Sequence, residues 1–329
     1  MDFLNESAQV YVEVEDFPKL RDVLNEKLEA YNRLPKEISM DLVLFRYAIV
    51  HVCKIYRIIQ MKRGHAFLVG VGGSGRHSLT RLAAYVQEFN VSQVEITKGF
   101  NLKAFREFLK EMYKVAGFKG KKTLSTVFIF SDNDVVHPSF LEDIQNMLNG
   151  GVVPNLYTPD ELGQLRESLR RPYKRMVGGV ETAEALEAFF FNNVKDNLHL
   201  SICFSPIGQA FKDYCKQYPA LINNTTIDWF MSWPEEALTE VAERFLASMN
   251  GLDGHAEPLA TLCSYTHSTT TESAAMMKAE LKKIFYVTPT NYIELLKGYN
   301  IILEDKRQVV DRQRVKLRSG LSKLDEARK

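Results

Sequence analysis

Short apolar runs alternate with helical spacing of apolar residues up to about position 233. Five of these runs predict strands: residues 66–69, which are expected to be buried, and residues 94–96, 126–130, 198–204 and 225–230. Strands that alternate with helices form a parallel sheet covered on both faces, so we predict an α/β fold with a five-stranded parallel sheet. Residues 152–197 interrupt the alternation with further helical spacing and are interpreted as an insertion.

The strand-like runs stop at Trp233-Pro234, and helical spacing follows. Residues 235–249, 258–264 and 272–285 predict a small all-helical lid domain. A last helix starts after Thr288-Pro289-Thr290 and has no stop signal before Lys329, so we expect the chain to belong to something longer. Apolar residues recur at every seventh position of that helix: Leu296, Leu303, Val310, Leu317 and Leu324.

This heptad spacing is typical of the seam of a two-stranded coiled coil. A lone helix with so polar a surface would be marginal in water, so the interpretation requires a partner helix. An ordinary surface helix that simply runs on is the alternative. With helices expected at 17–34 and from about residue 38, we divide the chain into four segments: 1–37 (linker and helical), 38–233 (large α/β), 234–289 (small helical) and 290–329 (coiled-coil helix).

Composition and charge narrow the class of protein. The chain has 329 residues, 45% of them hydrophobic, which is enough for one large or two ordinary cores. The formal charge of +1 gives no reason to expect a nucleic-acid or membrane surface held by charge. No leader and no apolar run of about 18 residues is present, so we expect neither secretion nor a transmembrane helix. The four cysteines are scattered and read as reduced thiols.

A glycine-rich stretch follows the first predicted strand and resembles the phosphate-binding loop G-x-x-x-x-G-K-[ST]. The glycines of that loop let backbone N–H groups crowd around a polyphosphate, its lysine contacts the β- and γ-phosphates, and its hydroxyl holds Mg²⁺. In this chain Arg76 stands in place of the lysine, and His77 stands in place of the residue with the hydroxyl. Ser78 lies about 100° further around a helix than His77. The residues expected to bind nucleotide here are Gly70, Val71, Gly72, Gly73, Ser74, Gly75, Arg76, His77 and Ser78.

An acid follows the strongest predicted strand. Asp132 stands at the carboxyl end of the run 126–130, and ligands of open α/β sheets bind at that edge. We therefore expect Asp132 to reach Mg²⁺ indirectly, through its water shell. The loop, the helix behind it and this acid together predict binding of ATP or ADP. The alternative is a glycine-rich turn that keeps the shape of the loop without a ligand.

The next residues argue against efficient hydrolysis. Asn133 occupies the position where a base is expected, and its amide can orient water but cannot accept a proton near neutral pH. Asp134 has suitable chemistry but, one residue further along a strand, would face the other way. We therefore predict tight or slowly exchanging nucleotide with little turnover. A working ATPase that uses a rearranged acid, Asp134 or Glu142, is the alternative.

Taken together, these residues resemble the fourth AAA+ module of axonemal dynein heavy chains. The resemblance runs from about Leu42 onward, and the Ile-Asp-Trp-Phe sequence at 227–230 is specific to dyneins among phosphate-loop proteins. The matching stretches are 63–83, 139–144, 149–156, 205–208, 218–223, 226–230 and 233–234. The resemblance implies one of six modules in a motor ring, with the last helix starting the microtubule-binding stalk and the main hydrolysis taking place elsewhere.

The same resemblance implies further site residues. Ser205 would lie at the γ-phosphate sensor position, where asparagine is commoner. Lys216 would lie at the position of an arginine finger that acts on the neighbouring module, and a solvated lysine is its alternative. The adenine pocket is expected at Val43, Leu44, Phe45 and Pro234, which could equally be core residues on a helix stripe.

The resemblance also implies partners and a place in the cell. The partners would be neighbouring AAA+ modules of the same heavy chain, a partner stalk helix, the microtubule, and dynein intermediate and light chains elsewhere in the complex. The expected location is the cytoplasm and cytoskeleton, in the axoneme of a cilium or flagellum. The leading hypothesis is a regulatory nucleotide-binding module that couples ring state to the stalk. A hydrolytically active module and a structural interaction domain with an empty loop remain as alternatives.

Overall fold

The chain forms two compact units, Met1–Met231 and Ser232–Lys329. The computed structural model describes residues 14, 16–35, 39–40, 42–118, 124–247, 249, 252 and 254–328. Residues 1–13 of the expected N-terminal segment lie outside the described residues, as does Lys329. The expected start of the second helix near residue 38 is wrong, because residues 39–40 and 42–45 are not helical and the helix begins at Arg46.

A five-stranded parallel sheet forms the centre of the first unit, in the order β2-β3-β4-β1-β5. Its strands are β1 (Ala66–Gly70), β2 (Asn90–Gln93), β3 (Thr126–Ser131), β4 (Leu198–Phe204) and β5 (Thr226–Phe230). The central strands β1, β3 and β4 are buried along their whole length, as expected for a sheet covered on both faces. The predicted α/β fold with its parallel sheet is confirmed.

The position predicted for the second strand is wrong. The expected run, 94–96, lies beyond Gln93, where β2 ends. β2 is an edge strand that pairs with β3, from Asn90 opposite Thr126 to Gln93 opposite Ile129. Apart from Val91 its residues are polar, and they are partly or fully exposed, so they form no apolar run, whereas Val94 just after the strand is buried.

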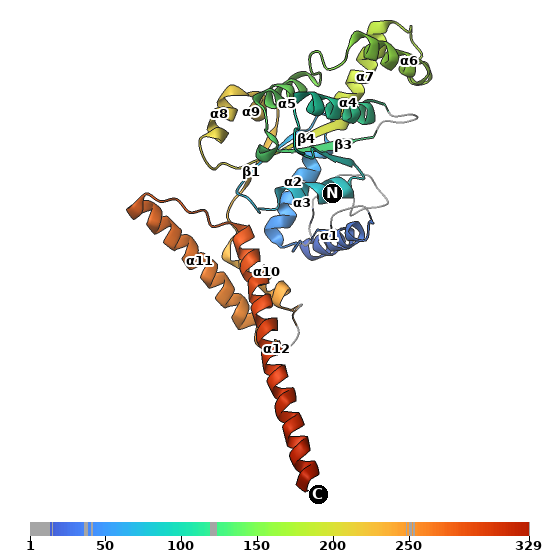
Figure 1. Ribbon diagram of the computed structural model, residues 1–329. Helices are drawn as coiled ribbons and strands as arrows, with labels where there is room; N and C mark the ends of the chain where they lie inside the picture. The colour runs from blue at the N-terminus through green and yellow to red at the C-terminus, as the bar shows by residue number, and fades with distance from the viewer. Residues whose placement is uncertain are drawn as a thin grey trace. The chain divides into compact units, whose positions relative to one another are not determined.

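Helices cover both faces of the sheet (Figure 1). One side carries α1 (Phe17–Asn32), α2 (Arg46–Gln60) and α3 (Arg76–Val86). The other side carries α4 (Leu102–Phe118), α5 (Pro138–Gly150), α8 (Ala210–Gln217) and α9 (Ala220–Asn223). The segment interpreted as an insertion forms α6 (Pro159–Met176) and α7 (Ala183–Asn197), which project from the α4 side.

An aromatic core fills the space between the sheet and helices α4, α5 and α7. The rings of Phe105 on α4 and Phe140 on α5 stack with their centroids 4.2 Å apart. Helix α7 packs closely on α4 through Phe190, because a Cβ at Gly117 would lie only 2.3 Å from that ring. Each fully buried phenylalanine stabilises the unit by about 1.5–3 kcal/mol, so this core fixes α7 to the sheet.

The second unit contains α10 (Glu235–Ala247), α11 (Ala256–Leu281) and α12 (Pro289–Arg328). The prediction of two separate helices, at 258–264 and 272–285, is wrong, because α11 is continuous. A threonine-rich stretch without large apolar side chains joins the two expected helices. The hydroxyls of Thr266, Thr270 and Thr271 each donate to the carbonyl four residues back, so these polar side chains are satisfied inside the helix.

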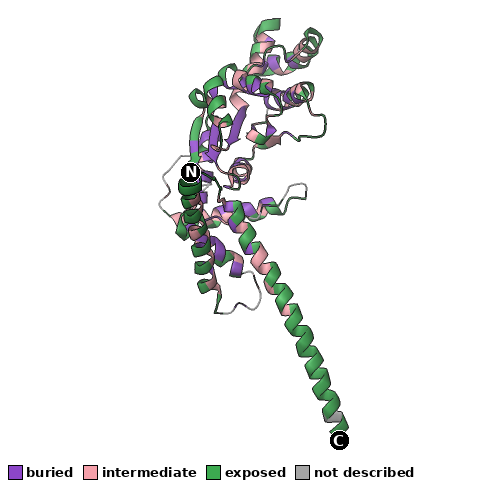
Figure 2. Ribbon diagram, turned by 60° about the vertical axis from the view of Figure 1, so that its left-hand side comes forward, coloured by how far each residue is buried: buried purple, intermediate pink, exposed green. Residues whose placement is uncertain are grey.

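Helix α12 begins packed and becomes exposed. The Tyr292 hydroxyl donates to the carbonyl of Leu238 on α10 at 2.8 Å, and Leu296 is fully buried. Further along, Val310, Leu317 and Leu324 are 60–70% exposed. Figure 2 shows the same change along the helix, from buried and intermediate to exposed. Three members of the predicted heptad seam are thus open to solvent. None of the helices that the structure describes is both long and apolar enough to cross a membrane.

A buried acid joins α2 to β5. Asp228, only 3% exposed, lies 2.5 Å from Nδ1 of His51 through Oδ2, and accepts a hydrogen bond from Nζ of Lys54 at Oδ1 (2.9 Å). The His51 ring stacks on Phe230 with centroids 4.0 Å apart. One carboxylate thus holds two side chains of one helix, and its removal would leave the buried His51 without a partner.

We therefore expect Asp228→Ala to lower the free energy of unfolding by about 3–5 kcal/mol, the usual effect of breaking a buried pair. Urea unfolding followed by circular dichroism measures this change. The matched control is Asp196→Ala, which removes an acid paired with the exposed Lys62 and Arg63 and should cost about 1 kcal/mol or less. Equal losses for the two variants would contradict the role of Asp228.

Candidate nucleotide-binding site

The glycine-rich loop begins where β1 meets β5. A Cβ at Gly70 would lie 2.6 Å from Cβ of Phe230, so only glycine fits at the end of β1. Gly73 and Gly75 have φ of 76° and 90°, in the left-handed region that other residues rarely adopt. Gly75 is the N-cap of α3, and Arg76 is its first residue. The glycines therefore turn the chain sharply from a buried strand into a helix whose amino end faces the loop.

Two polar groups in the loop have no hydrogen-bond partner among the described residues. They are Oγ of Ser74, a residue only 5% exposed, and Nη1 of Arg76. Buried polar atoms are normally paired, because an unsatisfied group costs about 1–3 kcal/mol. Both groups can donate a hydrogen bond, as can the free N–H groups at the start of α3. This set of donors fits a polyphosphate.

Arg76 lies back over the loop. Its Nη2 donates to the carbonyl of Val71 at 3.4 Å, and burial lowers its pKa, opposed by the nearby Cys203 and Asp132. Burial also lowers the pKa of His77, helped by Arg76, while Asp134 and Asp132 oppose it. The two residues that replace the usual lysine and hydroxyl thus lie close to the acids that follow β3. Ser78 is half-buried in the first turn of α3.

The acids after β3 form a 3-10 turn, Asp132–Asp134, at the carboxyl edge of the sheet. Oδ2 of Asp132 accepts the backbone N–H of Ser205 at 2.8 Å, which joins the ends of β3 and β4. Asn133 is exposed. The structure thus brings Asp132 and Ser205 together at the edge where β1 also ends in the glycine loop.

The interpretation of Asp134 as a strand residue facing the other way is wrong. The strand ends at Ser131, so side chains no longer alternate at position 134. Asp134 is buried, and its Oδ2 accepts both the N–H and the hydroxyl of Ser131, at 2.7 and 2.8 Å. This carboxylate closes the turn as part of a capping box with Ser131, so it already has a structural role. Glu142, the other candidate acid, is exposed on α5.

Two residues placed by resemblance have ordinary surroundings. The Ser205 hydroxyl accepts the backbone N–H of Ile207 at 3.4 Å, so it is engaged in its own turn. Lys216 is exposed in the last turn of α8.

Of the residues expected around adenine, Leu44 and Phe45 are buried, as core residues would be, but their expected place on a helix is wrong. They lie in the segment that precedes α2, and Phe45 is the extended N-cap of that helix. Helix α2 starts only at Arg46, and the adenine pocket stays a prediction. Val43 is half-buried. Pro234 belongs to the second unit, where its carbonyl accepts N–H groups from the first turn of α10.

No group of three or more histidine, cysteine or acidic side chains that could hold a metal occurs in the part of the chain that the structure describes. Of the two described acids that follow β3, Asp134 closes its own turn, which leaves Asp132 as the carboxylate expected to reach a metal. A Mg²⁺ ion here would have to be held mainly by phosphate oxygens and water.

Sequence reasoning missed the contacts between segments. The bond from Ser205 to Asp132 uses a backbone N–H and leaves no signal in the sequence. The pair of His51 and Asp228 does leave a sequence signal. His51 is a titratable residue on the otherwise apolar buried face of α2, and Asp228 is a titratable residue at a buried position of β5.

The fold and this loop define an α/β nucleotide-binding protein of the phosphate-loop class. The chain belongs to the family described as the P-loop containing dynein motor region D4, whose family model matches residues 40–302. Dynein-1-beta heavy chain of the flagellar inner arm I1 complex of Chlamydomonas reinhardtii is 46% identical over 325 residues, 98% of this chain. Human dynein axonemal heavy chains 2 and 6 are 42% and 39% identical, over 99% and 97% of this chain.

The chain spans 7–8% of the length of these curated relatives. The resemblance to dynein heavy chains is thus confirmed as a match to the motor region, while the number of the module stays a prediction. Among solved structures, that of Saccharomyces cerevisiae RIF2 covers 88% of this chain and 90% of its own, with a TM-score of 0.36 and 13% identity. A likeness that weak supports no inference.

Proposed function

We propose that this chain is a regulatory nucleotide-binding module of an axonemal dynein heavy chain, which holds ATP or ADP at residues 70–78 with little turnover. One observation carries the proposal: buried donors of Ser74 and Arg76 have no hydrogen-bond partner among the described residues, beside a turn in which Asn133 stands at the base position. The names of the relatives, which include axonemal and flagellar dyneins, support a place in the axoneme of a cilium or flagellum.

Binding would depend mainly on the backbone. The N–H groups of the loop and of the first turn of α3 would surround the phosphates, and the helix dipole favours their negative charge. Arg76 would turn its unpaired Nη1 to a phosphate oxygen, and Ser74 would donate its hydroxyl. Mg²⁺, where present, would be held by the phosphates and, through water, by Asp132. None of these contacts requires the lysine or hydroxyl of the usual loop.

Hydrolysis would be slow because no suitable base faces this site. The amide of Asn133 can position a water but cannot take its proton. The alternative base, Asp134, already accepts two hydrogen bonds from Ser131 at one carboxylate oxygen. A hydrolytically active module would have to break that capping box, and this favours retention of nucleotide over turnover.

The second unit would transmit the state of the site. The exposed apolar residues of α12 support its role as one strand of the stalk coiled coil, with a partner helix covering Val310, Leu317 and Leu324. The other proposed partners follow from the resemblance to dynein heavy chains. They are neighbouring AAA+ modules, which the exposed Lys216 would face, and the microtubule, which the chain would reach through the stalk. Intermediate and light chains would bind elsewhere in the complex.

Nucleotide binding is tested by identifying what the purified protein retains. We expect ATP or ADP at up to about one molecule per chain after acid extraction and chromatography. Arg76→Ala should weaken the binding of added ADP by about ten- to hundredfold, because it removes a charge-assisted hydrogen bond. Arg171→Ala, which removes an exposed arginine of α6, is the control. A protein that neither retains nor binds nucleotide would be the structural domain with an empty loop.

The missing base is tested by single-turnover hydrolysis. Asn133→Glu should raise the rate by about 10²-fold or more, the usual contribution of a general base. Asp134→Asn keeps an oxygen that can accept from Ser131 and should leave the low wild-type rate unchanged. A large loss of hydrolysis in Asp134→Asn would instead support the working-ATPase alternative, and no gain in Asn133→Glu would show that the base is not limiting.

Coupling to the stalk is tested in the longer heavy chain. Cysteines at Val310 or Leu317 of α12 can be cross-linked to the partner helix in two registers. We expect the rate of release of a fluorescent ADP analogue to differ by about fivefold or more between registers, the lower range of a typical coupling free energy. Identical release in both registers would rule out transmission through α12.

A further inference from the structure

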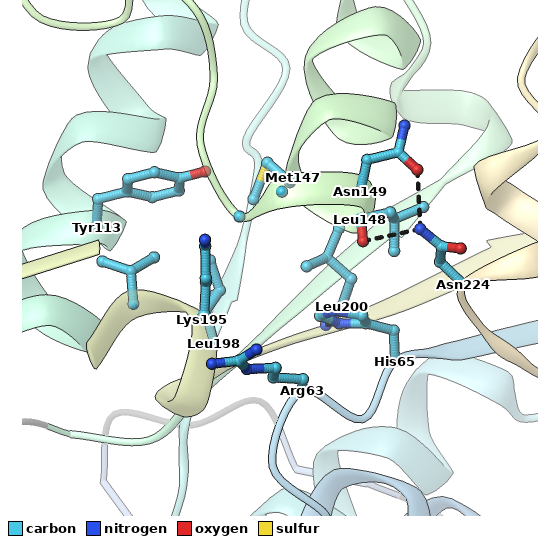
Figure 3. A pocket seen from close by; sticks show the side chains of 13 residues that line it. Arg63, His65, Tyr113, Met147, Leu148, Asn149, Lys195, Leu198, Leu200 and Asn224 are labelled. Atoms are coloured by element: carbon cyan, nitrogen blue, oxygen red, sulfur yellow. Dashed lines mark hydrogen bonds between the residues drawn. The ribbon is translucent and has the colours of Figure 1, made fainter. Parts of the chain in front are cut away.

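A second cavity lies at the opposite edge of the sheet from the glycine loop. It has a volume of ≈ 200 Å³ and is lined by residues at the amino ends of the strands, including His65 before β1, Leu198 at the start of β4 and Asn224 before β5 (Figure 3). In a parallel sheet the phosphate loop lies at the carboxyl edge, so the two places are separated by the length of the strands.

A buried phenol without a partner points into this cavity. Tyr113 on α4 is fully buried, and its hydroxyl has no hydrogen-bond partner within the described part of the chain. Figure 3 shows the hydroxyl directed at the space between α5 and the end of α7. A buried hydroxyl without a partner is unfavourable, so this group is arranged for something that occupies the cavity.

An unpaired ammonium lies beside it. Lys195, near the end of α7, is half-buried and forms no hydrogen bond or ion pair with any described residue, and its amino group points toward the same space (Figure 3). Its stem passes over Gly151, where a Cβ would lie 2.3 Å from Cγ of the lysine. The glycine that ends α5 therefore clears the way for Lys195 to enter the cavity.

The remaining polar lining includes the amides of Asn149 and Asn224, which bond to each other, and the side chains of His65 and Arg63. Nδ1 of His65 accepts the N–H of Leu200 at 3.1 Å, and burial, with His199 nearby, lowers the pKa of His65 to about 4. The ring is therefore neutral at pH 7 and carries its proton on Nε2. Arg63 stands at the rim, with Nε bound to Asp196. No carboxylate occurs among the described residues that line the cavity.

Apolar side chains form much of the lining: Met147, Leu148, Val194, Leu198 and Leu200. Hydrogen-bond donors and a positive charge beside apolar side chains fit a small molecule with an anionic head and an apolar body. We propose that this cavity binds a small organic carboxylate, whose anionic head contacts the Tyr113 hydroxyl and the Lys195 ammonium and whose short apolar body lies on Leu198 and Leu200.

Butyrate is the probe, titrated into the 329-residue chain in the presence of excess ADP and followed by calorimetry. Butyramide and butylamine serve as neutral and cationic molecules of the same size. We expect butyrate to bind at one site, at least about tenfold more tightly than either, because only the anion forms a charge-assisted bond with Lys195. Equal binding of the three, no binding of butyrate, or tighter binding of inorganic phosphate would overturn the proposal.

Two variants locate the site. Lys195→Met keeps the stem over Gly151 and Tyr113→Phe keeps the ring, and each should weaken butyrate binding about tenfold or more. The controls are Lys212→Met, an exposed lysine of α8, and Tyr157→Phe, whose hydroxyl donates to the carbonyl of Lys110. Unchanged binding in both cavity variants would overturn the assignment. Nuclear Overhauser effects from ¹³C-labelled butyrate to the Tyr113 ring test the same site without any variant, and binding without such effects would place the ligand elsewhere.

Discussion

The close approach of β1 and β5 at Gly70 is the constraint on which the candidate site depends. The end of β1 is so near Phe230 that a Cβ would lie 2.6 Å from Cβ of that residue. The last residue of β1 must therefore be a glycine, and the chain then turns through the loop into α3. On the same face of β5 as Phe230, Asp228 holds α2 through His51 and Lys54. The strand that crowds the loop is thus itself tied to a helix through the residue two positions before Phe230.

Much of the fold follows from local patterns. The runs that form β1, β3, β4 and β5, the glycine loop and the start of the last helix were all predictable, because each depends on neighbouring residues. The position of β2 depends on a tertiary contact, because this strand is held by pairing with β3 and shows no apolar run of its own. The failure at α11 is local: its threonine-rich stretch lacks the apolar spacing of a helix, yet the hydroxyls find partners within the helix, which runs on.

The candidate site was predictable in its residues but less so in their arrangement. The residues of the loop and the acid after β3 are enough to predict a phosphate-binding site. They do not reveal that Ser131 ends the strand, and that Asp134 closes a turn instead of alternating along it. The cavity at the other edge left no sequence signal. Tyr113, Gly151 and Lys195 come from three different helices or their ends, and only the packing of α7 on α4 and α5 brings them together.

Binding and turnover make different demands on such a site. Phosphate binding depends on backbone N–H groups, and these require the glycines and the start of α3, all of which this chain keeps. Activation of water depends on side chains, and there the chain departs from the usual loop with Arg76, His77 and Asn133. Substitutions of these side chains change catalysis without removing the backbone N–H groups that bind phosphate. Under the proposed function, a site of this composition would retain its nucleotide, as a regulatory module of a motor would need.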